Sequence, residues 1–298
     1  MILHAISTTI NYTIDNMDNY SFSKYGSTYV DQQLAYYQAN LPTADIELLK
    51  KIYSCIDLTT LSNADNNKSV LELVNTVNTH SQRYSDIPNV AGICVYPKFV
   101  DVVKENLKVD GVSIVSVAGA FPNAQTFTEI KVAEVRLAVE HGATEIDVVV
   151  NGGEMLAGNY DAALNELRLM REACRNVKLK VILETGVLKS DSLIYDAAII
   201  AMKAGADFVK TSTGKNEPAA TPRAVLVMAL AVKDFEQNTD KRIGIKPAGG
   251  IRTSQDAQLY AAIVGGILGN DRICNSTFRL GATSLAKNVL SDIASLKA

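Results

Sequence analysis

The sequence has no long apolar run and little excess charge of either sign. Its longest apolar runs, such as residues 224–232, are about half the ~20 residues that a membrane span needs. The formal net charge is −3, which predicts no general attraction to nucleic acid or to an anionic membrane. No basic patch precedes an apolar stretch at the start, so no secretory signal is expected. We therefore expect no nucleic-acid partner, no membrane partner and a cytoplasmic location.

Cysteine and histidine are also scarce. The four cysteines lie far apart and show no Cys-x-x-Cys or Cys/His spacing of a metal site. They are expected to be free thiols in a reducing compartment. The histidines are His4, His80 and His141, all isolated in the sequence, and we expect each at the surface. No metal site is predicted.

Hydrophobic residues make up 47% of the 298 residues, which is enough for a full-sized core. Residues 1–42 differ from the rest and form an N-terminal extension without a clear helical or strand period. Six of the twelve tyrosines lie there: Tyr12, Tyr20, Tyr25, Tyr29, Tyr36 and Tyr37. Because disordered chains are usually poor in aromatic residues, we expect this extension to pack on the main domain or on a neighbouring subunit. Residues 43–298 are expected to form that domain, beginning with a short helix over residues 43–52.

From residue 43 onward, short apolar segments alternate with longer helical periods. The predicted strands are 55–58, 91–95, 112–117, 145–150, 179–183, 207–211, 242–246 and 278–281. The predicted helices are 67–79, 97–107, 127–141, 160–175, 191–204, 222–236, 254–267 and 283–296. Eight strand–helix alternations predict an α/β fold, a single (β/α)8 TIM barrel. A doubly wound open sheet is the alternative, but no Gly-x-Gly-x-x-Gly follows the first strand.

Several helix ends carry recognisable signals. Thr126 with Glu129 fits a capping box, and Thr221 before Pro222 fits an N-cap followed by proline in the first turn. Gly142 and Gly205 each follow a helical period, as a glycine that ends a helix does.

Charged residues interrupt four of the predicted strands. They are Asp57, Asp147, Lys210 and Lys246. An ionised group inside a barrel is costly unless it is paired, so lysines and aspartates that converge there would offset each other's desolvation. One interpretation is a purely structural layer of ion pairs. The other is a reactive amine, because the two lysines lie on neighbouring predicted strands.

A lysine must be neutral to attack a carbonyl carbon. With an ordinary pKa of about 10.4, roughly one amine in 2,500 is neutral at pH 7. Burial and a second ammonium nearby both lower a lysine pKa. Lys210 and Lys246 could form such a pair, and these arguments do not decide which of them is the nucleophile.

Three glycine-containing loops follow the last three predicted strands. They cover residues 211–215, 248–251 and 281–284, and supply glycines, hydroxyl groups and Lys215. Backbone N–H groups can approach an anion closely at such glycines, and the loops after strands seven and eight of a TIM barrel often bind phosphate. Thr213-Gly-Lys215 is not a P-loop, because the upstream glycine of that motif is absent. The three loops together predict a phosphate site.

The segments around these residues resemble the signature segments of the deoxyribose-phosphate aldolase family. The resemblance covers about residues 57–290, in the same order as in the family. The segments are Cys55-Ile-Asp-Leu-Thr-Thr-Leu61, Ala91-Gly-Ile-Cys-Val-Tyr-Pro97, Glu145-Ile-Asp-Val-Val149, Val181-Ile-Leu-Glu-Thr-Gly186, Phe208-Val-Lys-Thr-Ser-Thr-Gly-Lys215, Gly244-Ile-Lys-Pro-Ala-Gly-Gly-Ile-Arg-Thr253 and Arg279-Leu-Gly-Ala-Thr-Ser284.

The resemblance implies a class I aldolase that needs no cofactor. The implied reaction is the reversible cleavage of 2-deoxy-D-ribose 5-phosphate, a step of deoxyribonucleotide catabolism, to D-glyceraldehyde 3-phosphate and acetaldehyde. Lys210 would form the Schiff base, Lys246 would be its electrostatic partner, and Asp147 would transfer protons through a water molecule. The implied substrate residues are Asp57, Thr59, Cys94 and Thr213, and the implied phosphate residues are Gly214, Lys215, Gly249, Gly250, Thr283 and Ser284. For Cys94 an inert buried thiol is the alternative.

Other functions remain open at this stage. Another Schiff-base sugar-phosphate aldolase would use the same residues on a different substrate. A phosphosugar-binding barrel without catalysis would not need the two lysines, and a pyridoxal-phosphate enzyme would need that cofactor. A homo-oligomer is compatible with the sequence, which does not set the number of subunits.

Overall fold

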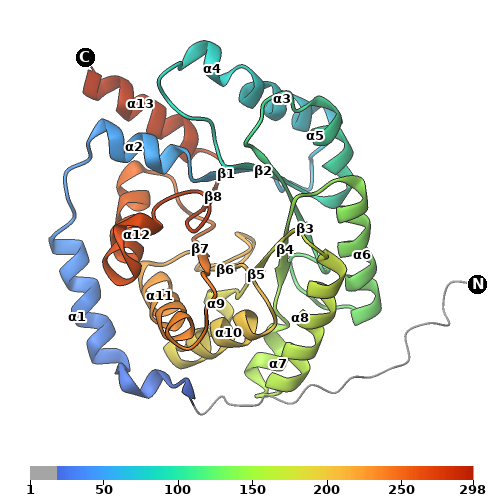
Figure 1. Ribbon diagram of the computed structural model, residues 1–298, viewed down its shortest axis with the longest axis vertical. Coiled ribbons are helices and arrows are strands. Elements are labelled where there is room, and N and C mark those ends of the chain that lie inside the picture. Colours follow the sequence, from blue (N-terminus) through green and yellow to red (C-terminus); the bar gives the residue numbers. More distant parts are fainter. Residues whose placement is uncertain (1–18, 298) are drawn as a thin grey trace, which may run out of the picture.

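Eight short apolar segments form parallel strands around one axis, and helices cover them on the outside (Figure 1). The computed structural model describes residues 19–297. The strands are β1 (Ile56–Thr59), β2 (Gly92–Val95), β3 (Ser113–Ala118), β4 (Glu145–Val149), β5 (Lys178–Ile182), β6 (Phe208–Lys210), β7 (Gly244–Lys246) and β8 (Leu280–Ala282). All eight overlap the predicted strands, because each apolar segment is bounded by turn residues.

Helices follow the strands in order. The longer helices are α1 (Gly26–Ala39), α2 (Ile46–Tyr53), α3 (Asn67–Asn78), α5 (Val100–Asn106), α6 (Thr128–His141), α8 (Tyr160–Cys174), α10 (Asp191–Lys203), α11 (Pro222–Gln237), α12 (Ser254–Leu268) and α13 (Leu285–Lys297). Short helices are α4 (His80–Arg83), α7 (Gly152–Leu156) and α9 (Thr185–Leu188), with 3-10 turns η2 (Phe22–Lys24), η3 (Pro97–Phe99) and η4 (Asn270–Arg272). Every predicted helix is present, and α2 is the short helix expected before the first strand.

The strands pair in sequence order, and β1 also pairs with β8. Between β7 and β8 the gap is bridged by two isolated pairs, Ile245 with Phe278 and Ala248 with Gly281. These bridges bring the two ends of the sheet together, as in a closed barrel. The predicted TIM barrel is therefore confirmed, and the open sheet is excluded because its outer strands would not meet.

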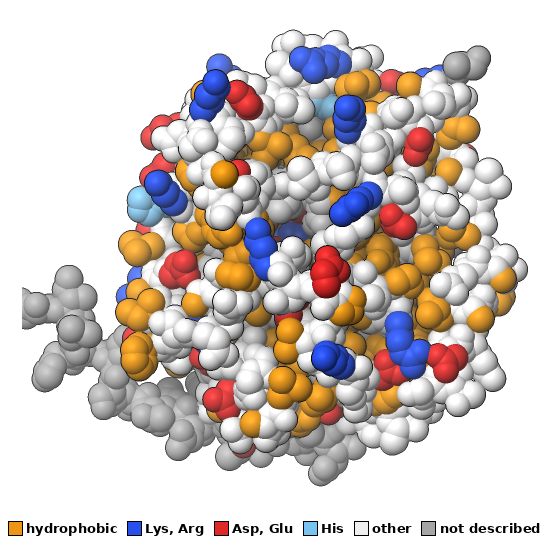
Figure 2. All heavy atoms as spheres, turned by 180° about the vertical axis from the view of Figure 1, so that it is seen from behind, with side chains coloured by type: hydrophobic (Ala, Val, Ile, Leu, Met, Phe, Trp, Pro, Cys, Tyr) orange, Lys and Arg blue, Asp and Glu red, His pale blue; other side chains and the backbone are white. Residues whose placement is uncertain are grey.

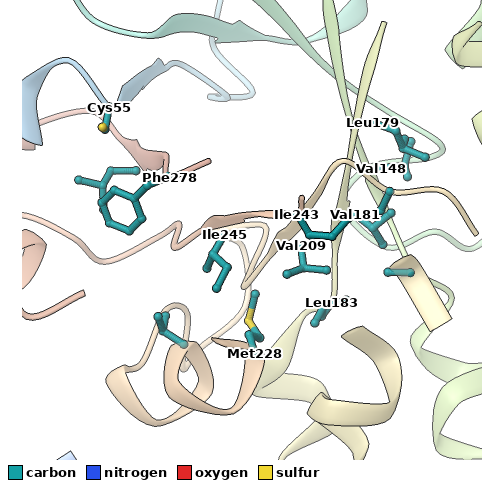
Figure 3. Close-up of a cluster of buried hydrophobic side chains, with 14 of the residues drawn as sticks. Cys55, Val148, Leu179, Val181, Leu183, Val209, Met228, Ile243, Ile245 and Phe278 are labelled. Atoms are coloured by element: carbon teal, nitrogen blue, oxygen red, sulfur yellow. The ribbon is translucent and has the colours of Figure 1, made fainter. Parts of the chain in front are cut away.

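The hydrophobic core lies between the strands and the surrounding helices. Figure 3 shows Val209 of β6 and Ile245 of β7 near Met228 of α11, and all three side chains are fully buried. Side chains alternate between the two faces of a strand. Because Val209 and Ile245 face the helices, the next residues on the same strands, Lys210 and Lys246, face the barrel interior. This alternation places charged groups in the interior.

The N-terminal extension packs on the barrel through α1, which lies across α11 and α12 (Figure 1). Val30 is fully buried, the Tyr25 hydroxyl donates to Asp234 of α11 at 2.7 Å, and Arg223 forms an ion pair with Asp31. The expectation of packing is confirmed for the described part, and Tyr12 lies outside it. The sequence shows no clear helical period before residue 43, yet α1 forms there. α1 has almost no amphipathic period and buries only one residue, so contacts with the barrel hold it.

The capping predictions had mixed outcomes. Thr221 accepts a hydrogen bond from Ala224 N as predicted, and Gly142 and Gly205 follow helices with φ of 115° and 96°. The capping box at Thr126 is wrong, because α6 begins one residue later, with Phe127 as its N-cap and no side-chain bond there.

The histidine expectations also had mixed outcomes. His141 is exposed as expected, and His4 lies outside the described residues. The surface expectation for His80 is wrong. That ring is buried, stacks on Tyr53 and bonds to the carbonyl of Ile87 at 3.0 Å, which satisfies it in the core.

Within residues 19–297, no helix combines the length and the apolar character that a membrane crossing requires.

Candidate active site

A pocket of about 870 Å³ opens at the carboxyl ends of the strands, where loops meet. This is the end of a TIM barrel at which active sites lie. Its walls come mainly from the loops after β1, β6, β7 and β8, and single residues from the loops after β2 and β3 complete them. The lining residues are Thr59, Thr60, Leu61, Ser62, Asn63, Tyr96, Pro122, Lys210, Thr213, Gly214, Lys215, Ala248, Gly249, Gly250, Ile251, Arg252, Gly281, Ala282, Thr283 and Ser284.

Lys210 lines this pocket, and its amine lies beside Asp147, which Lys246 also contacts. β6 and β7 pair in a register that places Lys210 directly opposite Lys246. Both amines contact the same carboxylate oxygen, Oδ2 of Asp147, at 2.7 Å from Lys210 and 2.8 Å from Lys246. The structure therefore brings the three residues together, with both lysines on Asp147. Only Lys210 of the three lines the pocket.

A second set of charges lies around this cluster inside the barrel. Lys180 contacts Oδ1 of Asp147 at 3.1 Å and Glu145 at 2.5 Å. Arg279 contacts Asp57 at 2.5 Å and Glu145 at 2.8 Å. All of these side chains are buried. Lys180, Glu145 and Arg279 were not predicted as site residues. Lys180 carried the same signal as Asp147, a charged residue in the middle of an apolar strand.

The buried layer contains more cations than carboxylates. Its cations are Lys180, Lys210, Lys246 and Arg279, and its carboxylates are Asp57, Glu145 and Asp147. With every group ionised, one positive charge is left without a partner of its own. An uncompensated buried charge is costly, so the layer is favoured when one lysine is neutral. Charge balance therefore points to one uncharged amine in this layer.

The pKa shifts indicate which amine that is. Burial lowers the pKa of Lys210, and the Lys246 ammonium lowers it further, against the opposing effect of the Asp147 carboxylate. Burial also lowers the pKa of Lys246, but two carboxylates, Asp147 and Asp57, outweigh this effect and raise the pKa above the ordinary value. Lys246 is thus the permanent cation of the pair, and Lys210 is the amine that loses its proton more easily.

Asp147 stays ionised in this arrangement. Burial alone would raise its pKa, but the ammonium groups of Lys180, Lys210 and Lys246 together hold it well below the ordinary value. A carboxylate with two lysines on one oxygen fixes the position of both amines. The Asp147 carboxylate also offers a hydrogen-bond acceptor beside Nζ of Lys210, the atom that would react.

All six residues predicted for phosphate line the pocket. Gly214, Gly249 and Gly250 have φ of 76°, 83° and 77°, a left-handed conformation that favours glycine. A Cβ on Gly249 would lie 3.0 Å from the Cα of Gly214. The two loops can therefore approach this closely only because glycine occupies position 249. Thr283 and Ser284 are exposed just before α13, whose first N–H groups can also meet an anion.

The four predicted substrate residues differ in their access to the pocket. Thr59 and Thr213 line it. Asp57 is fully buried and its carboxylate is engaged by Arg279 and Lys246. Cys94 is also fully buried, and burial raises the pKa of its thiol. Asp57 and Cys94 therefore lie behind the residues that line the pocket.

Glu184, which the sequence reasoning missed, holds the loop that carries Gly214 and Lys215. Its carboxylate is buried, accepts from the Thr213 hydroxyl at 2.5 Å and from Thr213 N at 3.2 Å, and also meets Asn216 at 3.2 Å. Its backbone is left-handed, with φ of 53°, which is costly for a residue with a Cβ. The Thr213 hydroxyl therefore points to Glu184, and its oxygen accepts from Lys215 N at 3.1 Å.

Replacing Glu184 with glutamine is expected to loosen this loop. The glutamine amide keeps the shape of the Glu184 side chain but has one acceptor oxygen, whereas both oxygens of the carboxylate accept hydrogen bonds from the loop. One donor of the loop therefore loses its acceptor. We expect KM for a phosphorylated substrate to rise about 10-fold, the equivalent of losing one hydrogen bond to a charged group. Steady-state kinetics on phosphorylated and unphosphorylated substrate measure this. Asn216→Ala, which removes only the outermost contact, is the control, and equal losses on both substrates would contradict a role at the phosphate loop.

Within the described part of the chain, no group of three or more histidine, cysteine, aspartate or glutamate side chains is placed to hold a metal ion. The polar side chains that line the pocket include the amines of Lys210 and Lys215, several hydroxyls, the Arg252 guanidinium and the Asn63 amide, which suit a sugar phosphate.

Comparison with known proteins gives consistent matches. Residues 51–272 match the model of the DeoC/LacD family aldolases. Deoxyribose-phosphate aldolase of Bos taurus is 40% identical over 255 residues, covering 81% of this chain and 79% of that protein. The Homo sapiens protein of the same name is 40% identical over 259 residues, covering 82% and 79%. The tetrameric deoxyribose phosphate aldolase of Aeropyrum pernix has a similar structure, with a TM-score of 0.63, 27% identity, and coverage of 91% and 99%.

Proposed function

The chain belongs to the DeoC/LacD family of aldolases, and from that membership we propose that it cleaves 2-deoxy-D-ribose 5-phosphate reversibly to D-glyceraldehyde 3-phosphate and acetaldehyde. The observation that supports this most directly is that Lys210, whose amine is paired with the Asp147 carboxylate, lines the same pocket as Lys215 and the glycine loops. The substrate needs both features, because it carries an aldehyde at one end and a phosphate at the other.

In the proposed first step, neutral Lys210 attacks the aldehyde carbon of the open-chain sugar. Water leaves, and a protonated imine forms on Nζ. The imine withdraws electrons, so the bond between C2 and C3 can break. Its electron pair moves to form an enamine on Lys210, and the C3 hydroxyl gives up its proton as D-glyceraldehyde 3-phosphate forms.

We assign the proton transfers to Asp147 and Lys246. Asp147 is the only carboxylate that touches Lys210 in the described residues, and Lys246 donates to the same oxygen at 2.8 Å. A carboxylate–water–lysine relay can accept the hydroxyl proton and later deliver a proton to C2 of the enamine. Hydrolysis of the resulting imine then releases acetaldehyde and restores Lys210.

The phosphate would lie on the wall formed by Gly214, Lys215, Gly249, Gly250, Thr283 and Ser284. Lys215 supplies a positive charge at the pocket, and the glycine loops supply backbone N–H groups. Thr59 would contact the sugar. Four free cysteines support a reducing, cytoplasmic setting, and a deoxyribose phosphate substrate supports a role in deoxyribonucleotide catabolism.

The proposed function is tested by direct assay. The purified chain is incubated with 2-deoxy-D-ribose 5-phosphate, and both D-glyceraldehyde 3-phosphate and acetaldehyde are measured. Equal amounts of the two products are expected. Turnover of a ketose phosphate instead would favour a different Schiff-base aldolase. Binding of the sugar phosphate without any product would favour a non-catalytic barrel.

Ser284→Glu is expected to weaken the phosphate end of the site. A carboxylate at this exposed position of the pocket would repel the phosphate dianion. We expect KM for 2-deoxy-D-ribose 5-phosphate to rise about 100-fold or more, since repulsion of about 3 kcal/mol corresponds to that factor. Turnover of free 2-deoxyribose should change by only about 2-fold. Ser284→Ala is the control, and equal losses on both substrates would argue against this phosphate position.

A further inference from the structure

The pocket does not surround Lys210 on all sides. Its lining residues come from the loops after β1, β6, β7 and β8, with Tyr96 and Pro122 from the loops after β2 and β3. In the described chain, no residue of β4, of β5 or of the segments between them and β6 lines it. Figure 2 shows the end of the barrel at which the pocket opens, with basic side chains near the centre of that face. On the β5 side of Lys210, the protein itself fills the interior.

Ile182 is the residue of β5 directly beside Lys210. The two residues are paired on neighbouring parallel strands, so their side chains lie on the same face of the sheet, which is the barrel interior. Val149 pairs with Ile182 in turn, and lies on the same face of β4 as Asp147. Ile182 is 0% exposed and Val149 is 3% exposed. The Lys210 amine contacts Asp147 at 2.7 Å, so the reactive nitrogen lies in the part of the interior that Val149 and Ile182 border.

Phe121 supports these side chains from the loop after β3. Three buried residues form an apolar cluster that is separate from the main core, and Phe121 packs against it. We call these four residues the β5 wall: Phe121, Ala124, Val149 and Ile182. The Phe121 ring also meets Tyr96 edge to face, with ring centroids 6.0 Å apart and an interplanar angle of 70°. The turn that carries Phe121 is closed by a hydrogen bond from Ala124 N to the carbonyl of Ala120 at 2.9 Å. The β5 wall is therefore packed from both sides and leaves no open space.

A carbonyl carbon bound to Lys210 as an imine carries two further substituents. In an aldehyde sugar phosphate one of them is hydrogen, and the other is the carbon chain, which must follow the open pocket toward the glycine loops. A ketone has a second carbon in place of the hydrogen, and that carbon would have to enter the space of Ile182. Forcing an additional carbon into a closely packed interior is costly. The same cost applies to the hydroxymethyl carbon of a ketose phosphate.

We propose that Ile182, supported by Phe121, is a specificity-determining residue that restricts the carbonyl compounds bound by Lys210 to aldehydes. This inference rests on the proposed function, because it requires that Lys210 forms an imine. One additional methylene group in a filled apolar site changes selectivity about 10–200-fold. Discrimination between a ketone and an aldehyde is expected to fall in that range.

The first test measures imine formation without a sugar phosphate. The full-length chain is incubated with cyanoborohydride and either acetaldehyde or acetone, and mass spectrometry of the digested protein follows the reduced adduct on Lys210. Relative to acetaldehyde, acetone should react with wild-type Lys210 at least about 30-fold more slowly than it does with a simple alkylamine. Ile182→Ala should reduce this discrimination about 10-fold. Ile182→Val removes less of the packing, so it keeps the test readable if the alanine variant does not fold, and should reduce the discrimination about 3-fold.

Ile146→Ala and Ile146→Val are the matched controls. Ile146 is also a fully buried isoleucine of a strand, but it belongs to the main core between the strands and the helices. These changes should lower the melting temperature and leave the ratio of the two carbonyls unchanged. Phe121→Ala should reduce the discrimination, because Ile182 loses its support, whereas Phe121→Leu keeps an apolar side chain there and should retain most of it.

The outcomes separate this inference from the proposed function. A wild type that reacts with both carbonyls in the ratio of the alkylamine overturns the inference, and so does an unchanged ratio in both Ile182 variants. No label on Lys210 with either carbonyl overturns the inference and the proposed function together. Cleavage of 2-deoxy-D-ribose 5-phosphate is measured in parallel. A chain that discriminates against acetone as expected but does not cleave this sugar supports the inference and contradicts the proposed function.

Discussion

Replacing Lys210 with arginine is expected to reduce turnover of 2-deoxy-D-ribose 5-phosphate at least about 10⁴-fold, or about 5.4 kcal/mol in the barrier. Arginine keeps the positive charge beside Asp147 but stays protonated, so it cannot attack a carbonyl carbon. The loss should appear in kcat, because the phosphate wall of the pocket is untouched. Steady-state kinetics and substrate binding measured separately provide the check.

Chemical trapping identifies the nucleophile directly. Borohydride added with substrate reduces the imine to a stable amine, and mass spectrometry of the digested protein should locate the adduct on Lys210. Lys210→Arg should give no adduct, whereas Lys215→Arg, a change at the phosphate wall, should still be labelled on Lys210. An adduct on Lys246 would reverse the roles that we assign to the two lysines.

Replacing Lys246 with leucine is expected to change both the rate and its dependence on pH. Lys246 touches the same Asp147 oxygen as Lys210 and lowers the pKa of Lys210. Without this cation, only Lys210 remains on that Asp147 oxygen, while Lys180 stays on the other, so the pKa of Lys210 rises. Only the neutral amine reacts, so turnover increases as Lys210 loses its proton. In the pH profile of the variant, this increase should occur at a higher pH than in the wild type. At neutral pH turnover should fall about 100-fold or more, which corresponds to a shift of about two pKa units.

The pH profile of kcat separates this effect from simple disruption of the site. Part of the lost activity should return as the pH is raised, because more of Lys210 becomes neutral. Lys246→Arg, which keeps a cation at this place, should retain a profile closer to that of the wild type. An unchanged profile in Lys246→Leu would mean that Lys246 does not control the protonation of Lys210.

Much of the site could be predicted because its signals are local. Lys210 and Lys246 interrupt short apolar strands, and a strand places alternate residues on opposite faces. The flanking Val209 and Ile245 had to face the helices, so the lysines had to face inward. The three glycine loops could be predicted in the same way, since each directly follows a strand and the carboxyl ends of parallel strands meet at one end of a barrel.

Other parts of the site and of the fold could not be predicted, because the residues around them show no local pattern. Glu145 and Arg279 lie at or next to the start of a strand, where a charge is unremarkable, yet Arg279 contacts Asp57 across 222 positions of sequence. Glu184 follows a strand as many surface residues do, and only the fold shows that it holds Thr213. The hydrophobic period of α1 is too weak to be recognised in the sequence. The helix has no continuous apolar stripe, because tyrosines and ion pairs attach it to the barrel.

The sequence by itself determined the eight parallel strands, the helices around them and the inward direction of Asp147, Lys210 and Lys246, because alternation along a strand and the periods of helices are properties of neighbouring residues. Only the tertiary structure decided that both lysines share one Asp147 oxygen and that Lys180 and Arg279 complete the charged layer. Those features depend on barrel closure and strand register, which bring together groups that are distant in the chain.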